Sequence, residues 1–304
     1  MLGRKPRGRP VDGVVLLDKP VGLTSNQALQ AVKRLFDARK AGHTGSLDPL
    51  ASGMLPICLG EATKLSGFLL NADKSYRVEC LLGITTETGD REGAVRSRRP
   101  VPVLGPRELE AVLAEFRGQI AQVPPMYSAL RHQGRRLYEL ARRGLEVPRQ
   151  PRTVMIHRLH CLRLQGERLE LEVRCSKGTY IRSLVEDMGE ALGCGAHVSA
   201  LRRLTVAPYQ STQMVSLQQL EALAGSGHGS LDQALQPVDS ALGEWPRLNL
   251  NTDLAHYLRH GQPVIVPRAP VDGMVRLYEG ESRFIGVGEI IDDGRVAPRR
   301  LVQA

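Results

Sequence analysis

A single carboxylate stands in the most unusual segment of the chain, residues 40–60, KAGHTGSLDPLASGMLPICLG. The segment is rich in glycine, proline and small residues, and its one acid is Asp48. Because Pro49 restricts the residue before it to extended conformations, the backbone of Asp48 is stiff. A rigid loop could present this carboxylate to a ligand. Composition alone favours the simpler interpretation, an Asx-turn in which Asp48 bonds its own backbone.

A second candidate segment, CSKGTYIR at residues 175–182, ends a predicted strand and opens a predicted helix. Helix entries offer free backbone N–H groups. Arg182 lies off the apolar stripe that begins with Ile181, Leu184 and Val185, so it need not face the core. It is either a surface or capping charge, or the bidentate partner of a carboxylate.

Hydrophobic periodicity predicts the elements that must position these residues. We expect strands over residues 14–17, 76–82, 154–164 and 169–175, and an ordered loop over residues 40–60. Helices are predicted over residues 61–70 and 109–116, from a cap at Thr24 or Ser25, and from Ile181 to Leu192. Residues 124–152 are predicted to form a loop with a short helix near residues 137–142. Residues 222–238 have the composition of a linker, and beyond residue 248 the pattern predicts one short helix followed by short strands.

Two short segments carry the whole excess of positive charge. The chain has 41 Lys and Arg against 32 Asp and Glu, a net charge of +9. Residues 1–10 contribute +4, and residues 124–152, with seven arginines and two glutamates, contribute +5. Although a solvated face could carry one such cluster, two of them favour a polyphosphate ligand and hence a nucleic acid.

Other classes of protein are not supported by the sequence. No apolar stretch is long enough for a membrane span, and the basic N-terminus lacks the apolar region of a secretory signal. The five cysteines are scattered and never spaced C-x-x-C, so neither a disulfide framework nor a zinc site is expected. Nucleotide-binding glycine motifs and metal-ligand spacing are also missing. We therefore expect a cytoplasmic protein with no metal and no cofactor.

The chain resembles the TruB family of bacterial tRNA pseudouridine synthases, which act on uridine 55 of the T-loop. The resemblance runs in order from about residue 13 to 303, and its most specific block is GHTGSLDPLASG. Further matching blocks are VVLLDKPVGLTSNQ (14–27), DKSYRVECLLG (73–83), QVPPMYSALRHQGRRLYELARRG (122–144), CSKGTYIRSL (175–184) and GAHVSALRRL (195–204).

This resemblance implies a fold and a domain organisation. The fold class is α+β: a large mixed, mostly antiparallel sheet flanked by helices, with a small C-terminal β domain of PUA type. The implied domains are a basic arm at 1–12, a catalytic domain at 13–240 and a PUA-like RNA-binding domain at 248–304. Residues 124–152 correspond to the family's mobile loop, which closes over the RNA arm.

The resemblance also implies the site residues. Asp48 would be the nucleophile, Arg182 its ion-pair partner, and Tyr76 would stack on the target base. His43 would contact the nucleotide, while Tyr180 and Leu201 would line the base pocket. Within the matching blocks, Lys19, Arg131 and Arg142 are further candidates for RNA binding, and Arg131 stands where many members of the family have lysine.

The chemistry agrees with this interpretation. Forming pseudouridine breaks the N1–C1′ bond, turns the uracil and rejoins it through C5, so no redox change or group donor is required. A carboxylate could add covalently or remove the ribose C2′ proton, and the sequence leaves both routes open. The expected partner is the T-arm of tRNA, with no membrane and no protein partner, and we expect a monomer.

Three alternatives remain open. The chain could be a non-catalytic RNA-binding protein, such as a tRNA-folding chaperone, and chaperone activity could also accompany the isomerase. It could modify uridine with a methyl or sulfur donor. It could also depend on a guide RNA.

Overall fold

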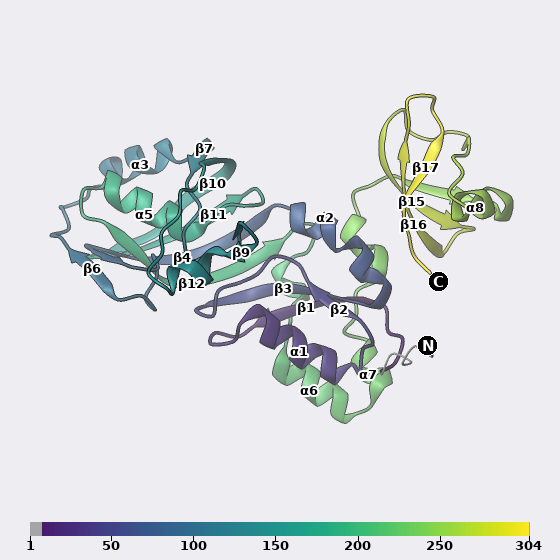
Figure 1. Cartoon of the computed structure of the whole chain (residues 1–304), viewed down its shortest axis with the longest axis horizontal. Helices are drawn as coiled ribbons and strands as arrows, with labels where there is room; N and C mark the ends of the chain where they lie inside the picture. The colour runs from purple at the N-terminus through teal and green to yellow at the C-terminus, as the bar shows by residue number, and fades with distance from the viewer. Residues whose placement is uncertain (1–7, 304) are drawn as a thin grey trace. The chain divides into compact units, whose positions relative to one another are not determined.

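The chain begins its regular structure with a buried strand followed by a capped helix (Figure 1). The structure is a computed structural model that describes residues 8–303. Strand β1 (Gly13–Lys19) is buried along nearly its whole length. Helix α1 (Ser25–Leu35) starts at a capping box in which Thr24 accepts from the Gln27 backbone, and it buries Ala28 and Val32. Both elements confirm the predictions made from the apolar pattern.

The segment predicted as an ordered loop contains two strands. Strand β2 (Ala41–His43) pairs antiparallel with β3 (Ala51–Leu59), with His43 opposite Ile57. All but one residue of β3 are buried. The loop prediction was therefore wrong for residues 51–59. A strand buried on both faces has a continuous apolar sequence, and the glycines and prolines around it concealed that signal.

Contacts divide the chain into two compact units. One unit comprises Met1–Asp48, Met54–Leu70 and Ala207–Ala304, and the other Pro49–Gly53 and Asn71–Val206. This division cuts the predicted 13–240 domain, whose bounds stay a prediction. Of the predicted basic arm, residues 1–7 lie outside the described residues.

Short helices complete the α/β part of the first unit. The 3-10 helix η1 (Gly60–Leu65) leads into α2 (Ser66–Asn71), which confirms the helical prediction for this stretch. Strand β13 (Val215–Ser216) pairs in parallel with β1. Helices α6 (Leu217–Gly225) and α7 (His228–Asp232) and the 3-10 helix η3 (Val238–Leu242) occupy most of the predicted linker.

Residues 247–301 of the first unit form a small sheet with a core of its own. The strand order is β14-β15-β16-β17, and helix α8 begins at an N-cap on Asn251. Leu250, Leu258 and Val275 belong to its buried core. The elements are β14 (Arg247–Leu250), α8 (Thr252–Arg259), β15 (Gly273–Glu279), β16 (Arg283–Ile290) and β17 (Val296–Leu301).

The second unit is built on a mostly antiparallel sheet in the order β12-β4-β11-β10-β7. Each neighbouring pair in this order is antiparallel, and β12 also pairs in parallel with the first residues of β3. The predicted mixed sheet flanked by helices is thus confirmed. The strands are β4 (Lys74–Leu82), β7 (Gly118–Gln122), β10 (Arg152–Gln165), β11 (Arg168–Cys175) and β12 (Ala196–Val206).

Two helices cover one face of this sheet. Helix α5 (Ile181–Ala191) packs against β12 and β4, and α3 (Pro106–Glu115) packs against β10 and α5 (Figure 1). The predicted stripe from Ile181 is buried, which explains why α5 forms here. Helix α3 begins with proline at its first position, where the missing N–H is not needed.

Two hairpins extend from the sheet of the second unit. The first pairs β5 (Ile84–Thr86) with β6 (Val95–Arg98). The second, within the basic segment, pairs β8 (Arg131–His132) with β9 (Arg135–Arg136) and continues into α4 (Leu137–Ala141). The short helix predicted near residue 137 is confirmed, whereas the hairpin before it was not predicted.

Candidate active site

Asp48 lies between two buried leucines in the turn that connects β2 and β3. Leu47 is 6% exposed and Leu50 is 2% exposed, while Asp48 itself is half-buried. Ser25, the first residue of α1, fixes this turn: its hydroxyl accepts from the Leu47 N–H at 2.8 Å and donates to the Leu47 carbonyl at 3.0 Å. The backbone that carries the carboxylate is therefore anchored to the start of a helix.

The two other candidates in this unit lie at strand ends. His43 ends β2 and is half-buried. Lys19 ends β1 and is 0% exposed, and its ammonium donates to the carbonyls of Pro20 at 2.8 Å and Leu23 at 2.7 Å. These bonds hold the turn between β1 and α1. The ammonium is thus bound within this turn, and a role of Lys19 in RNA binding stays a prediction.

In the second unit, Tyr76 on β4 and Leu201 on β12 lie on adjacent strands. The register pairs Leu201 with Val78 and Arg203 with Tyr76. Because alternate residues of a strand share a face, Tyr76 and Leu201 belong to the same face of the sheet. They are 7% and 8% exposed, so each shows only a small part of its surface. The structure therefore brings these two predicted residues together.

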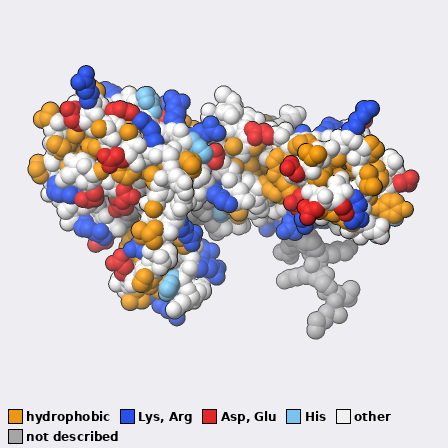
Figure 2. Space-filling view, turned by 90° about the horizontal axis from the view of Figure 1, so that it is seen from above, with side chains coloured by type: hydrophobic (Ala, Val, Ile, Leu, Met, Phe, Trp, Pro, Cys, Tyr) orange, Lys and Arg blue, Asp and Glu red, His pale blue; other side chains and the backbone are white. Residues whose placement is uncertain are grey.

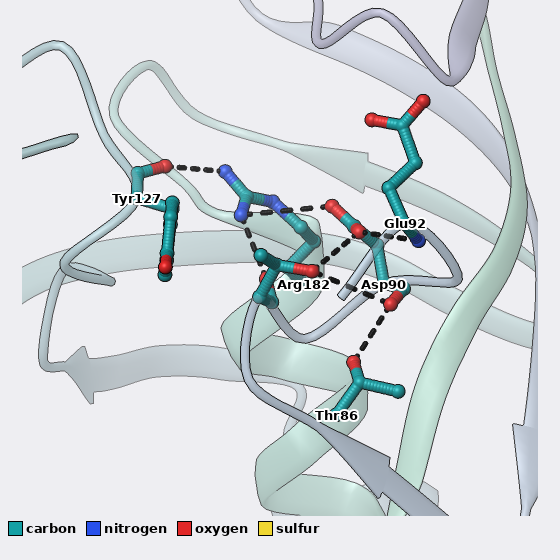
Figure 3. A network of polar contacts seen from close by, with 6 residues as sticks. Thr86, Asp90, Glu92, Tyr127 and Arg182 are labelled. Atoms are coloured by element: carbon teal, nitrogen blue, oxygen red, sulfur yellow. Dashed lines mark hydrogen bonds and ion pairs between the residues drawn. The ribbon is translucent and has the colours of Figure 1, made fainter. Parts of the chain in front are cut away.

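Arg182, in the first turn of α5, is the centre of a buried polar network (Figure 3). Its guanidinium donates to the carbonyls of Thr88 at 2.8 Å and Tyr127 at 2.7 Å. The carboxylate of Asp90 lies 3.7 Å away, and both side chains are less than a tenth exposed. Arg182 is thus neither a surface charge nor a helix cap, which excludes the simpler interpretation of its role.

Asp90 is itself held by its own turn, between β5 and β6. Its carboxylate accepts from the Thr88 hydroxyl at 2.6 Å and from the Glu92 N–H at 3.0 Å, and its carbonyl accepts from Thr86 at 2.7 Å (Figure 3). The arrangement fixes a charged pair in a buried place, where pairing is required.

Tyr180 precedes Arg182 and is the N-cap residue of α5. The side chain of Gln122, which is 2% exposed, accepts from the Tyr180 N–H at 3.0 Å and donates to its carbonyl at 3.2 Å. Gln122 ends β7, directly before the basic segment. Together with the bond from Arg182 to Tyr127, this link ties the start of α5 to the base of residues 124–152.

The basic segment exposes its cations around a small apolar centre. Leu137 and Leu140 are buried, while Arg131 and Arg142 are exposed. The guanidinium of Arg142 lies 5.5 Å from the ring centre of Tyr138. Elsewhere in the unit several arginines pair with acids, as Arg158 does with Glu172 at 3.5 Å. The face shown in Figure 2 likewise carries positive, negative and apolar side chains in mixture.

The sequence matches known protein families along most of its length. "TruB family pseudouridylate synthase (N terminal domain)" matches residues 33–181, and two TruB C-terminal domain families match residues 182–243 and 246–302. The tRNA pseudouridine synthase B of Nitrosococcus oceani is 57% identical over 299 residues, which cover 98% of this chain and 97% of that protein. The chain belongs to the TruB family of pseudouridylate synthases. It is therefore an enzyme of the isomerase class.

Further TruB relatives and solved structures agree. The protein of the same name from Serratia proteamaculans is 57% identical over 97% of this chain and 96% of its own. A solved "Cbf5-Nop10-Gar1 Complex" contains a chain that is 26% identical, with a TM-score of 0.74 over 96% of this chain and 84% of that one. A structure of an "H/ACA RNP bound to a substrate RNA containing 2'-deoxyuridine" has the same fold, with a TM-score of 0.74 at 23% identity, and covers 99% of this chain and 91% of that chain.

Two acidic residues, Asp48 and Asp90, differ in what the sequence predicted of them. Asp48 belongs to the first unit and Arg182 to the second, so their ion pair stays a prediction. Asp90 was missed altogether, because the stretch TTETGDREG carries no periodicity and has the composition of a solvated turn. Its signal was the spacing of Thr86, Thr88 and Asp90, three polar side chains that can bond within one turn.

Proposed function

We propose that the chain converts uridine 55 in the T-loop of tRNA to pseudouridine, with Asp48 as the catalytic carboxylate. Relatives that match it nearly end to end carry the name tRNA pseudouridine synthase B, which supports tRNA as the substrate. The observation that carries the assignment of Asp48 is its position in the GHTGSLDPLASG block, half-buried on a turn anchored by Ser25.

The reaction requires one ionised carboxylate and a closed site that orients the uridine. Asp48 either attacks the sugar or base covalently, or removes the C2′ proton so that a glycal forms. In both routes the carboxylate acts in its charged form. A carboxylate facing an apolar pocket tends to protonate, and a nearby guanidinium opposes this. We assign that part to Arg182, which its bonds to Thr88, Tyr127 and Asp90 hold in one place.

The target uridine must leave its stack before it can react. Flipping a base costs a few kcal/mol, and stacking on an aromatic ring returns about 1–3 kcal/mol per base. Tyr76 is suited to this because it is mostly buried and sits on a central strand of the second unit. Leu201, which shares its face of the sheet, supplies an apolar wall, and we assign Tyr180 and His43 to the same pocket.

Phosphates of the RNA arm are bound, in this proposal, by the basic segment 124–152. Arg131, Arg136 and Arg142 are exposed and lie on the hairpin or at the ends of the short helix α4. The base of this segment is tied to α5 through Gln122 and Arg182. Closure of this segment over RNA would therefore also move the residues at the start of α5. Arg131 and Arg142 are the proposed contacts within it.

The test is position mapping on a bare transcript. We expect purified protein to convert the uridine at position 55 in an unmodified T-arm stem-loop, without any added donor or guide RNA. A requirement for a methyl or sulfur donor, for a guide RNA, or conversion of another uridine would contradict the proposal. Binding without any conversion would favour the chaperone interpretation.

The proposed location follows from the substrate. The five cysteines are free, and four of them are buried. No helix within residues 8–303 is long and apolar enough to cross a membrane. Free thiols persist in the reducing cytoplasm, where tRNA is also present, and we place the protein there.

A further inference from the structure

The most buried residue of strand β7 is a glutamine. Gln122 is 2% exposed, whereas the other residues of β7 are half-buried or exposed. It ends the strand and pairs in register with Arg152, the first residue of β10. The basic segment 124–152 therefore leaves the sheet and returns to it beside Gln122. Since a buried amide is stable only when its polar atoms are bonded, the partners of this side chain indicate its role.

The oxygen and the nitrogen of the Gln122 amide both bind the backbone of one residue. The oxygen accepts from the Tyr180 N–H at 3.0 Å, and the nitrogen donates to the Tyr180 carbonyl at 3.2 Å. Because one partner is a donor and the other an acceptor, only one orientation of the amide satisfies both. The same carbonyl accepts the first bond of α5, from the Leu184 N–H at 3.1 Å. Gln122 therefore holds the residue from which α5 starts.

Two other helices of the chain obtain the bond to their N-cap N–H locally, from their own third residue. In α1, Gln27 accepts from the Thr24 N–H at 2.8 Å. In α6, Gln219 accepts from the Ser216 N–H at 2.8 Å. The third residue of α5 is a serine, and the glutamine comes from β7, 58 residues away along the chain. A local glutamine would cap the helix equally well, but only a glutamine on β7 can also fix the start of α5 relative to the base of the basic segment.

Two further bonds join the first turn of α5 to this base. Arg182 donates to the Tyr127 carbonyl at 2.7 Å (Figure 3), and the hydroxyl of Ser183 donates to the Val123 carbonyl at 3.4 Å. Both bonds are made by side chains of α5. The bonds from Gln122 differ because they act on the backbone of Tyr180, the residue that the proposed function places in the base pocket.

We propose that Gln122 is a positioning residue for the isomerisation: its amide sets the place of Tyr180 from the base of the basic segment, so that RNA binding by the segment brings the tyrosine to the flipped nucleotide. The inference rests on the proposed function, in which Tyr180 lines the base pocket and residues 124–152 bind the RNA arm. Because Gln122 is almost completely buried, it acts through Tyr180 and not by contact with RNA.

Gln122→Met tests this role, because methionine has a similar length, cannot donate and accepts only weakly. We expect the rate of conversion of a T-arm stem-loop to fall roughly tenfold or more, while the Kd for the same RNA stays within about threefold. The reason is that the phosphates still bind the segment and only the placement of Tyr180 is lost. Gln219→Met is the matched control: it removes the same kind of bond at the start of α6 and should leave both values unchanged.

Gln122→Glu separates the two bonds. An ionised carboxylate accepts from the Tyr180 N–H but cannot donate to the Tyr180 carbonyl, whereas a protonated carboxyl can do both. Burial would raise the pKa of this carboxyl, so a lower pH restores the donor. We expect the rate of this variant, divided by the wild-type rate at the same pH, to rise at least about threefold from about pH 8.5 to about pH 6. A cap that only stabilised the helix would leave this ratio constant while the folded state persists.

The outcomes distinguish the possible failures. A wild-type rate in Gln122→Met would overturn the inference, and so would an equal loss of rate in Gln219→Met. A loss of RNA affinity as large as the loss of rate would also overturn it, because the residue would then support only the segment. If Gln122→Met does not fold, Gln122→Glu decides, and a ratio that does not change with pH overturns the inference. A wild-type protein that makes no pseudouridine would instead refute the proposed function.

Discussion

Replacing Asp90 by asparagine removes one charge from the buried network around Arg182 and leaves its shape nearly unchanged. At the observed 3.7 Å, and with an effective dielectric constant of about 20, Coulomb's law gives an attraction of about 4.5 kcal/mol for the pair. Breaking a buried ion pair by removing one partner costs about 3–5 kcal/mol, which agrees with this value. The variant is therefore expected to remove one of the charges that stabilise the buried guanidinium of Arg182.

Part of this free-energy cost should raise the activation barrier of the reaction. Because Arg182 keeps its bonds to the carbonyls of Thr88 and Tyr127, its position is not lost completely. We take about 2 kcal/mol as the loss that reaches the transition state, within the range for hydrogen bonds to charged groups. Since each 1.36 kcal/mol is tenfold in rate, kcat should fall roughly 30-fold while the Kd for RNA stays within a few-fold.

The assay is single-turnover conversion of a T-arm stem-loop, with RNA binding measured in parallel. Glu92→Gln is the matched control, because Glu92 is an exposed acid of the same turn whose side chain extends away from Arg182 (Figure 3). It should leave kcat unchanged. An Asp90→Asn enzyme with a wild-type rate would refute the reasoning that Arg182 needs this carboxylate.

Three further predictions concern RNA binding and stability. Changing Arg135, Arg136, Arg142 and Arg143 to glutamine should reduce the slope of log K for RNA binding against log salt concentration by about 3, at 0.7–0.9 per lost phosphate contact. Glutamine at the paired residues Arg158 and Arg174 is the control. An unchanged slope in the fourfold variant would show that the segment does not contact the RNA. The pKa of Lys74 is about 8 in the folded chain against 10.5 unfolded, so the unfolded chain binds more protons between these values and stability rises with pH. From pH 8 to 10 the wild type should gain up to roughly 3 kcal/mol relative to Lys74→Met in urea unfolding, whereas equal pH dependence would contradict the lowered pKa. Tyr278→Phe removes the bond from its hydroxyl to Asp239 and should lower the stability of the full chain by about 1.5–3 kcal/mol in thermal unfolding, and an unchanged midpoint would show that the bond contributes nothing.

Much of the fold follows from local patterns. The stripe from Ile181 predicted α5, and alternation predicted β10 and β11, because each of these elements buries one face and exposes the other. The cap at Thr24 was also visible, since a threonine followed three residues later by glutamine forms a capping box.

The central strands were harder to predict, for physical reasons. Strand β12 buries Arg203 at 1% exposure, so its pattern of apolar and polar residues does not report which side chains face the core. Strand β3 begins with small residues that permit a close approach to β12, and its composition is that of a loop. In both cases tertiary contacts override the local pattern.

Some residues of the candidate site could be predicted from the sequence, and others could not. Asp48 could be singled out as the only acid of an unusual segment, but its role came from the resemblance to the TruB family. Lys19 was chosen by its place in a matching block, and nothing in the sequence indicated that its side chain would be buried. Asp90 contributes to the site only because the turn after β5 reaches α5 in the folded unit, which no spacing in the sequence indicates.

The most direct test of the central claim is the Asp48→Asn variant in single-turnover conversion of the T-arm uridine. Asparagine keeps the size and removes the charge, so we expect pseudouridine formation to fall to background while RNA binding stays within about threefold of the wild type. Conversion by Asp48→Asn at the wild-type rate would contradict the account, because another group would then have to carry the reaction.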